Sequence, residues 1–168
     1  MFRFTRHERA HRRAPEAGRR LPGWGFAGSP VTDGMLRQAA GARLIAAPNQ
    51  QVLIPVALRY GRADPLAVHI DFPSLVSPDD RDMTWTFARE LLAQGLYQPA
   101  GIGDVYIWPC GPAYTIMEFR GAEGRAVAKF DTSVLRRFLL RSYALVDRGS
   151  EDVEPALDKG LAALLGEV

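Results

Sequence analysis

The fold can be inferred first from the stretch of residues 52–72, VLIPVALRYGRADPLAVHIDF. Apolar side chains occupy alternate positions in both of its halves: Val52, Ile54, Val56 and Leu58, then Leu66, Val68, Ile70 and Phe72. Alternation with a period of two is typical of strands that bury one face. Residues 61–65, GRADP, separate the halves and combine the glycine and proline that turns favour. The stretch therefore predicts a β-hairpin.

Further strands are predicted on both sides of this hairpin. Strand signals begin near Met35, and residues 42–47 give a first strand that ends at the turn Pro48-Asn49. Downstream, Met83, Trp85 and Phe87 alternate. Three more strands follow at residues 103–108, 113–119 and 124–130, with turns at 111–112 and 121–124.

Three helices are predicted from changes in the apolar spacing. The first follows Phe87, and we expect Gly95 to be its C′ residue. The second is capped by Asp131 or Thr132 and runs to about Val146. The third starts near Asp152 and places five apolar residues on one face: Val153, Leu157, Leu161, Leu164 and Val168.

This order of elements predicts an α+β fold. Runs of consecutive strands pair antiparallel, and helices then cover one face or one end of the sheet. We expect about seven strands and three helices in one domain, residues 35–168, a size at which no disulfide or metal is needed for folding. Residues 1–34 show neither helical nor strand periodicity and are expected to be a disordered basic extension, with Met35 as an alternative start.

Charge and cysteine content narrow the functional classes. Residues 1–34 carry seven arginines against three acids, +4, whereas residues 35–168 carry 14 basic and 16 acidic side chains, −2. A domain of net −2 is a poor match for a polyanion. Cys110 is the only cysteine, so no internal disulfide forms and a reducing, cytoplasmic compartment is expected. No apolar run approaches the ~18 residues of a membrane span.

No set of residues in the sequence predicts a metal site or a cofactor. Two of the three histidines lie in the basic extension, and metal sites need three or four clustered ligands. His69 and Asp71 share a strand face, but it is the face opposite Val68 and Ile70, so a solvated polar face is expected. The acidic loop containing Asp79, Asp80 and Asp82 lacks the glycine and distal glutamate of a calcium loop.

Catalytic residues and ligand loops are equally hard to find. Cys110 with His69 is the only thiol pair available, and nothing nearby in the sequence lowers the thiol pKa, so a structural cysteine is expected. The glycines of residues 101–104 precede a strand instead of opening a helix, which predicts a turn and not a phosphate loop. Trp24, Trp85 and Trp108 could stack on bases, but the alternation around Trp85 favours core packing. We therefore predict no enzymatic activity, and the partner-binding residues stay unassigned.

Several short motifs, in this order, resemble those of the SsgA-like proteins of sporulating, filamentous actinomycetes. They are Leu58-Arg59-Tyr60, Ala63-Asp64-Pro65, Ala67-Val68-His69, Trp85-Thr86-Phe87-Ala88-Arg89-Glu90-Leu91-Leu92, Gly95-Leu96, Pro99, Gly103-Asp104-Val105 and Trp108-Pro109. The resemblance covers about residues 36–166. Two features depart from the family pattern: the basic extension has no counterpart, and Gly61 replaces an expected aspartate.

The resemblance implies a fold and a function. It implies a Whirly-like architecture of two strand-rich repeats, each ending in a helix, assembled as a homotrimer. It also implies a non-enzymatic regulator of sporulation-specific cell division that acts as an adaptor at the septum. That adaptor would place the septum, recruit the tubulin-like division protein FtsZ or a paralogue, or control septal peptidoglycan. The alternative is a single-stranded nucleic-acid-binding protein, suggested by the related architecture and the basic extension.

Overall fold

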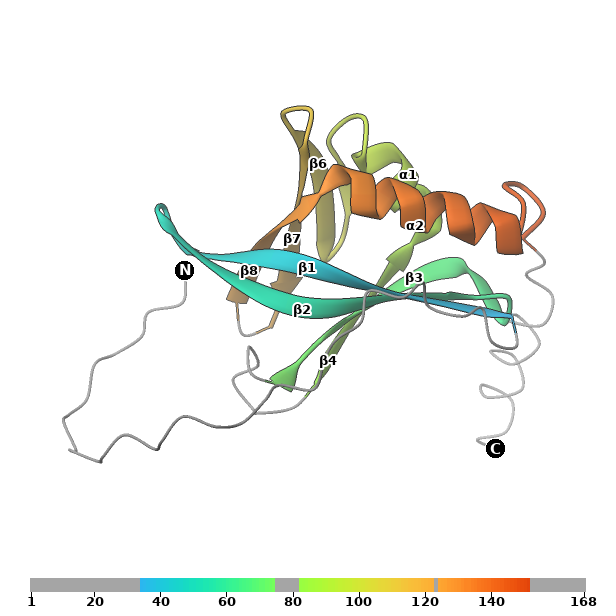
Figure 1. Ribbon diagram of the computed structural model, residues 1–168, viewed down its shortest axis with the longest axis horizontal. Coiled ribbons are helices and arrows are strands. Elements are labelled where there is room, and N and C mark those ends of the chain that lie inside the picture. Colours follow the sequence, from blue (N-terminus) through green and yellow to red (C-terminus); the bar gives the residue numbers. More distant parts are fainter. Residues whose placement is uncertain (1–33, 75–81, 123, 152–168) are drawn as a thin grey trace, which may run out of the picture.

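The computed structural model describes residues 34–74, 82–122 and 124–151. The predicted basic extension (residues 1–33 of it), the acidic loop around Asp79 and the third predicted helix lie outside these residues. Within them, the chain forms eight strands and two helices (Figure 1). The α+β class and the antiparallel sheet are confirmed.

The first half of the fold contains four strands and a short helix. The strands are β1 (Met35–Ala47), β2 (Gln50–Gly61), β3 (Asp64–Phe72) and β4 (Met83–Ala88), and the helix is α1 (Arg89–Gly95). β1 begins at Met35, where the strand signals start, and is longer than the predicted 42–47 segment. The predicted hairpin is β2–β3, with Ala57 opposite Asp71 and Leu58 opposite Ile70.

The second half repeats this order. It contains β5 (Ala100–Ile102), β6 (Val105–Cys110), β7 (Tyr114–Gly121), β8 (Gly124–Asp131) and α2 (Thr132–Leu145). Asp131 is at the N-cap position of α2, as predicted, but its side chain makes no capping hydrogen bond. Instead the Thr132 hydroxyl is buried and lies 2.9 Å from the Thr115 hydroxyl. Each run of four strands is thus followed by one helix.

All eight strands form one antiparallel sheet in the order β4-β3-β2-β1-β8-β7-β6-β5. The two halves join where Ala42, Arg43 and Leu44 of β1 pair with Phe130, Lys129 and Ala128 of β8. The sheet curls, and this brings β7 close to β3 and β4, which are distant from it in the strand order. Phe119 of β7 contacts Phe72 of β3 and Trp85 of β4, each with ring centroids 5.3 Å apart. Trp85 therefore packs against the core, as predicted.

The two helices cover the inner side of the curled sheet (Figure 1). α2 contributes Leu135, Phe138 and Leu139 to the core, and α1 contributes Leu92. Tyr60 of β2 is also fully buried, and its hydroxyl donates to the carbonyl of Pro65 at 2.8 Å. Because both helices lie on one side, they come next to each other, and a pocket lies between them.

Three local predictions were wrong. Leu66 is 51% exposed although it shares the parity of Val68 and Ile70, because the pairing register of β2 and β3 shifts between Arg59 and Gly61. Gly101 lies in strand β5 and not in a turn; the turn before β6 is made by Gly103, with a φ of 79°, and Asp104. Gly95 is the last residue of α1, and a Leu96 with helical angles follows it, so no left-handed C′ glycine is present there.

Candidate functional site

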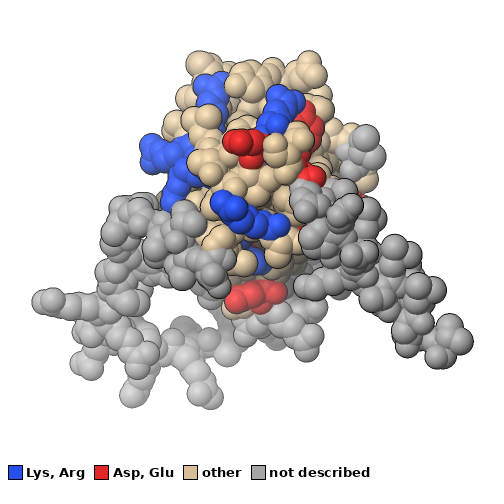
Figure 2. Space-filling view, turned by 90° about the vertical axis from the view of Figure 1, so that its right-hand side faces the viewer, with Lys and Arg blue, Asp and Glu red and all other residues tan. Residues whose placement is uncertain are grey.

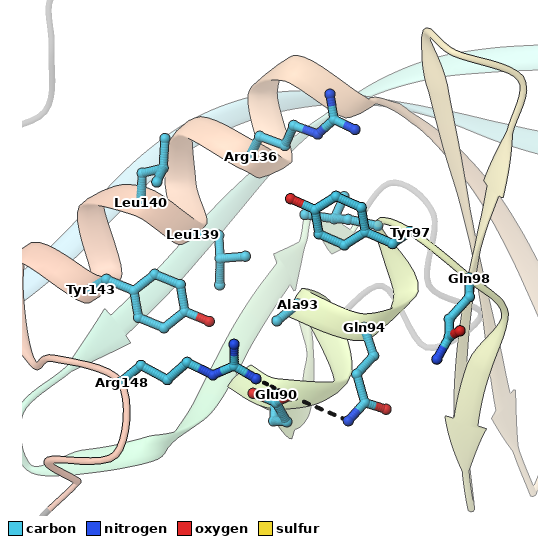
Figure 3. Close-up of a pocket in the computed structure, with 11 residues that line it drawn as sticks. Glu90, Ala93, Gln94, Tyr97, Gln98, Arg136, Leu139, Leu140, Tyr143 and Arg148 are labelled. Carbon is cyan, nitrogen blue, oxygen red and sulfur yellow. Dashed lines mark hydrogen bonds and ion pairs between the residues drawn. The ribbon is translucent and has the colours of Figure 1, made fainter.

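A pocket between α1 and α2 is the candidate interaction surface. It has a volume of about 410 Å³ and is lined by side chains of both helices and of the turn after α1 (Figure 3). On α2 the lining residues Arg136, Leu140 and Tyr143 are spaced i, i+4 and i+7, which places them on one helix face. That face is distinct from the one that packs on the sheet. We call this pocket the α1–α2 groove.

The floor of the α1–α2 groove is apolar and its mouth is open. Ala93, Leu96 and Leu139 are buried beneath it. Tyr97 and Leu140 both line it and are 74% and 69% exposed, the highest values among the large exposed apolar side chains in the described part of the chain. A concave, mainly apolar pocket is the default candidate for a binding site.

Charged and polar side chains surround the apolar floor. Arg148 donates to Glu90 at 2.7 Å, and Gln94 donates to the same carboxylate at 3.3 Å (Figure 3). The guanidinium of Arg136 lies over the Tyr97 ring, 5.7 Å from its centroid. The pair Arg148–Glu90 is largely exposed and therefore contributes little to stability. Its position across one end of the groove makes it a contact that an incoming segment would meet.

Arg89 fixes the relative position of the two helices. Its side chain is 3% exposed and donates to the carbonyls of Ser142 at 3.1 Å and Val146 at 2.7 Å. A second nitrogen forms an ion pair with Glu151, and this hydrogen bond lowers the pKa of the Glu151 carboxyl. The guanidinium also lies 4.8 Å from the Tyr60 ring centroid and 4.7 Å from that of Tyr143. One arginine of α1 thus holds the end of α2 and the segment after it.

His69 and Asp71 point to the outer face of the sheet, as predicted, but both are half-buried in polar contacts. Asp71 accepts two hydrogen bonds from Arg59 and one from the Thr84 hydroxyl at 2.8 Å. His69 lies 2.8 Å from the hydroxyl of Thr86 on β4. These side chains therefore connect β2, β3 and β4 across the sheet. Three or more His, Cys, Asp or Glu side chains do not gather as a metal site anywhere in the described ranges.

The hydrogen bonds of Asp71 are expected to make the stability of the fold depend on pH. The hydrogen bonds from Arg59 hold the pKa of Asp71 below its ordinary value of 3.8. A carboxyl with a lowered folded-state pKa stabilises the fold at pH values above its unfolded pKa, and this contribution is lost as the pH falls through the folded pKa. Asp71→Asn is therefore expected to lower stability at neutral pH and to reduce the loss of stability on acidification below 3.8. Urea unfolding across this range measures both effects; parallel curves for the two proteins would contradict the assignment.

Cys110 and His69 do not form a nucleophile–base pair. Cys110 is exposed at the end of β6, opposite Tyr114, whereas the His69 ring contacts Thr86 and, at 3.9 Å, Asp64. The described residues of the acidic loop give no ion site either, because Asp82 accepts a hydrogen bond from the backbone N–H of Ser74. Asp79, Asp80 and Trp24 lie outside the described residues.

The outer face of the second half combines aromatic and basic side chains. Tyr106, Trp108 and Tyr114 lie there, but two of the three rings already carry cations of the protein. Arg120 lies 4.0 Å from the Tyr106 ring centroid, and Lys129 and Arg43 lie 4.6 and 5.4 Å from that of Tyr114. A nucleic-acid base could stack on those faces only after these cations move. On a different face, the right-hand side of Figure 1, basic and acidic side chains are interspersed with uncharged ones (Figure 2).

Sequence reasoning missed the α1–α2 groove. Leu140 stands next to Leu139, and one apolar run hides the fact that the two residues belong to different helix faces. Tyr97 lies in the turn after α1, and outside a helix or strand no repeat of apolar residues indicates whether a side chain is buried or exposed. One signal was available: Arg136, Leu140 and Tyr143 are spaced i, i+4 and i+7, which places them together on a helix face other than that of Leu135 and Phe138.

Comparison with known proteins identifies the family. The model of the family described as "Streptomyces sporulation and cell division protein, SsgA" matches residues 54–151. The chain is 40% identical over 127 residues to the sporulation-specific cell division protein SsgB of Salinispora tropica, covering 71% of this chain and 88% of that protein. It is 36% identical over 128 residues to SsgB of Streptomyces coelicolor, covering 74% of this chain and 91% of that protein.

The fold is also shared with solved structures. The crystal structure of an SsgA-like sporulation-specific cell division protein from Thermobifida fusca superposes with a TM-score of 0.65 at 31% identity. The match covers 79% of this chain and 97% of that chain. No helix in the described residues is long and apolar enough to cross a membrane. The matches in sequence and in structure agree, and the chain belongs to the SsgA family of sporulation and cell division proteins.

Proposed function

We propose that this protein is a non-enzymatic adaptor for sporulation-specific cell division, acting at the septum on the cytoplasmic side. The observation that carries the proposal is its identity of 36–40% with SsgB proteins over most of their length. The structure supports it with an open apolar groove flanked by charged side chains, which suits protein contacts. The described ranges hold no cluster of metal-ligand residues, and His69 and Cys110 are held apart.

The partner that we propose is a division protein, FtsZ or another SsgA-like paralogue, and the active form is a homotrimer. We expect light scattering to give the mass of three chains of 18.5 kDa each. We expect the full chain to retain purified FtsZ or a paralogue in a binding assay, and a fluorescent fusion to concentrate at sporulation septa. A monomer that binds neither class of protein would contradict this assignment.

Complementation tests the absence of catalysis. A deletion strain is expected to misplace septa or to form abnormal spores. The double variant His69→Gln with Cys110→Ser is expected to restore septation as fully as the native gene, because neither side chain takes part in chemistry. Loss of complementation by a variant that folds and accumulates normally would show that one of these residues is functional.

The second candidate function is single-stranded nucleic-acid binding, and the aromatic and basic outer face favours it. Counterion release would then make the affinity of the full chain for a labelled oligonucleotide fall steeply, by about tenfold or more between about 50 and 200 mM salt. We expect instead only weak binding that is lost when the chain starts at Met35. Micromolar binding that survives this truncation and is lost in Lys129→Glu would favour the second function over the adaptor.

A further inference from the structure

The described chain ends next to the α1–α2 groove. Its last described residue, Glu151, is bound to Arg89, and the Arg89 guanidinium lies against the ring of Tyr143, a lining residue of the groove. Arg148, three residues before Glu151, also lines the groove. Residues 152–168 therefore start beside one end of an apolar pocket. As a helix, these 17 residues would extend about 25 Å, enough to follow α2 for most of its length.

The sequence of this segment suits the groove. The five residues of its predicted apolar face, Val153, Leu157, Leu161, Leu164 and Val168, match the apolar floor and the exposed Tyr97 and Leu140. An amphipathic helix of this spacing needs an apolar surface to cover it.

Charge complementarity points the same way. Residues 152–168 contain four acids, Asp152, Glu154, Asp158 and Glu167, against Lys159, for a net charge of −3. α2 contains three arginines, Arg136, Arg137 and Arg141, and no acidic residue; of these Arg136 lines the groove, together with Arg148, whose charge is shared with Glu90. Because residues 152–168 are joined to α2 by only a few residues, attraction between their opposite charges raises the fraction of molecules in which the segment is docked.

We infer that residues 152–168 occupy the α1–α2 groove of their own chain, as a helix whose leucines cover Tyr97 and Leu140. The groove is then closed by the protein itself in its free form. Any protein that uses the groove competes with this segment, so the segment sets the strength of such an interaction. This occupancy does not depend on which division protein the family member serves.

Disulfide trapping in the full-length protein tests the inference. In a Cys110→Ser background, Leu140→Cys is combined with Leu157→Cys or Leu161→Cys, and mild oxidation is followed by non-reducing electrophoresis and mass spectrometry. Leu140 is 69% exposed, so its replacement leaves the core intact. A docked segment should give an intramolecular disulfide about tenfold faster than a free tether does.

Two matched controls define the outcome. Leu53→Cys is equally exposed, at 68%, but lies on the β1–β2 hairpin, and Lys159→Cys lies on the opposite side of the predicted helix. Each control should form its disulfide slowly. Equal rates in all pairs would overturn the inference, and a disulfide found between two chains would show that a second copy fills the groove.

Hydrogen exchange gives an independent measurement. Leu157→Asp with Leu161→Asp should release the segment and speed amide exchange in residues 90–97 about tenfold, while exchange in β7 stays unchanged. Unaltered exchange at residues 90–97 would overturn the inference. No division protein is present in either experiment, so their failure would leave the adaptor function standing, and failure of the adaptor function would leave this occupancy standing.

Discussion

Replacing Arg89 with leucine is expected to lower the free energy of unfolding by about 3 kcal/mol or more. The guanidinium is buried, and its removal leaves the carbonyls of Ser142 and Val146 without their donor and Glu151 without its ion pair. A buried acceptor that loses its donor costs about 1–3 kcal/mol by itself. Arg89→Lys should fall between native and leucine, because an ammonium cannot reach all of these acceptors in one plane.

Urea unfolding followed by circular dichroism measures the loss, and Arg148→Leu is its control. Arg148 also forms an ion pair with a carboxylate, but both side chains are largely exposed, at 65% and 46%. Exposed pairs contribute less than about 1 kcal/mol. Similar losses in the two variants would mean that Arg89 acts as a surface charge and does not hold α2.

The second large effect is expected at Gly95. A Cβ atom built at this position would lie 2.4 Å from both Cβ and Cγ2 of Ile107 on β6. Alanine in a helix is favoured over glycine by up to about 1 kcal/mol, so propensity alone would make Gly95→Ala stabilising. The clash outweighs this gain, since overpacking costs about 1–3 kcal/mol and Ile107 is fully buried with no room to move. We therefore expect Gly95→Ala to destabilise the protein and to shift α1 away from the sheet.

Gly61→Ala is the matched control for this substitution. The nearest atom to a Cβ at Gly61 is 3.8 Å away, an ordinary contact, and its backbone angles suit any residue. Its effect should stay within about 0.5 kcal/mol. Differential scanning calorimetry on the three proteins measures the ranking. A stabilised Gly95→Ala would show that β6 can move aside and that helix propensity dominates.

Periodicity located most of the sheet because most strands bury one face. The alternation of residues 54–58 and 68–72 was sufficient to place β2 and β3, whereas Val52, predicted on the same face, is 46% exposed. β5 was missed because it has only three residues and one of them is glycine, which gives neither alternation nor strand propensity. The exposure of Leu66 follows from a register shift, a property of the strand pair that no single strand reveals.

The residues that position α1 against β6 and α2 could not be assigned from the sequence for a related reason. Gly95 was assigned to a helix terminus, where glycine is common, but its role comes from a contact with Ile107, twelve residues later. Arg89 reads as a surface residue, because buried arginines are rare without partners. Its partners are the carbonyls of residues 142 and 146 and the carboxylate of Glu151, more than 50 positions away. Only the folded chain brings them together.

The Arg89 contacts also constrain the order of events during synthesis. When the first four strands and α1 leave the ribosome, the guanidinium has no acceptors, since Ser142, Val146 and Glu151 have not yet been translated. β1 likewise cannot pair with its second neighbouring strand, β8, until Ala128, Lys129 and Phe130 have been translated. The nascent first half therefore keeps an unpaired strand edge until β8 has emerged, and Arg89 stays hydrated until residues 142–151 have emerged. A chain truncated before residue 151 would fold without the Arg89–Glu151 ion pair.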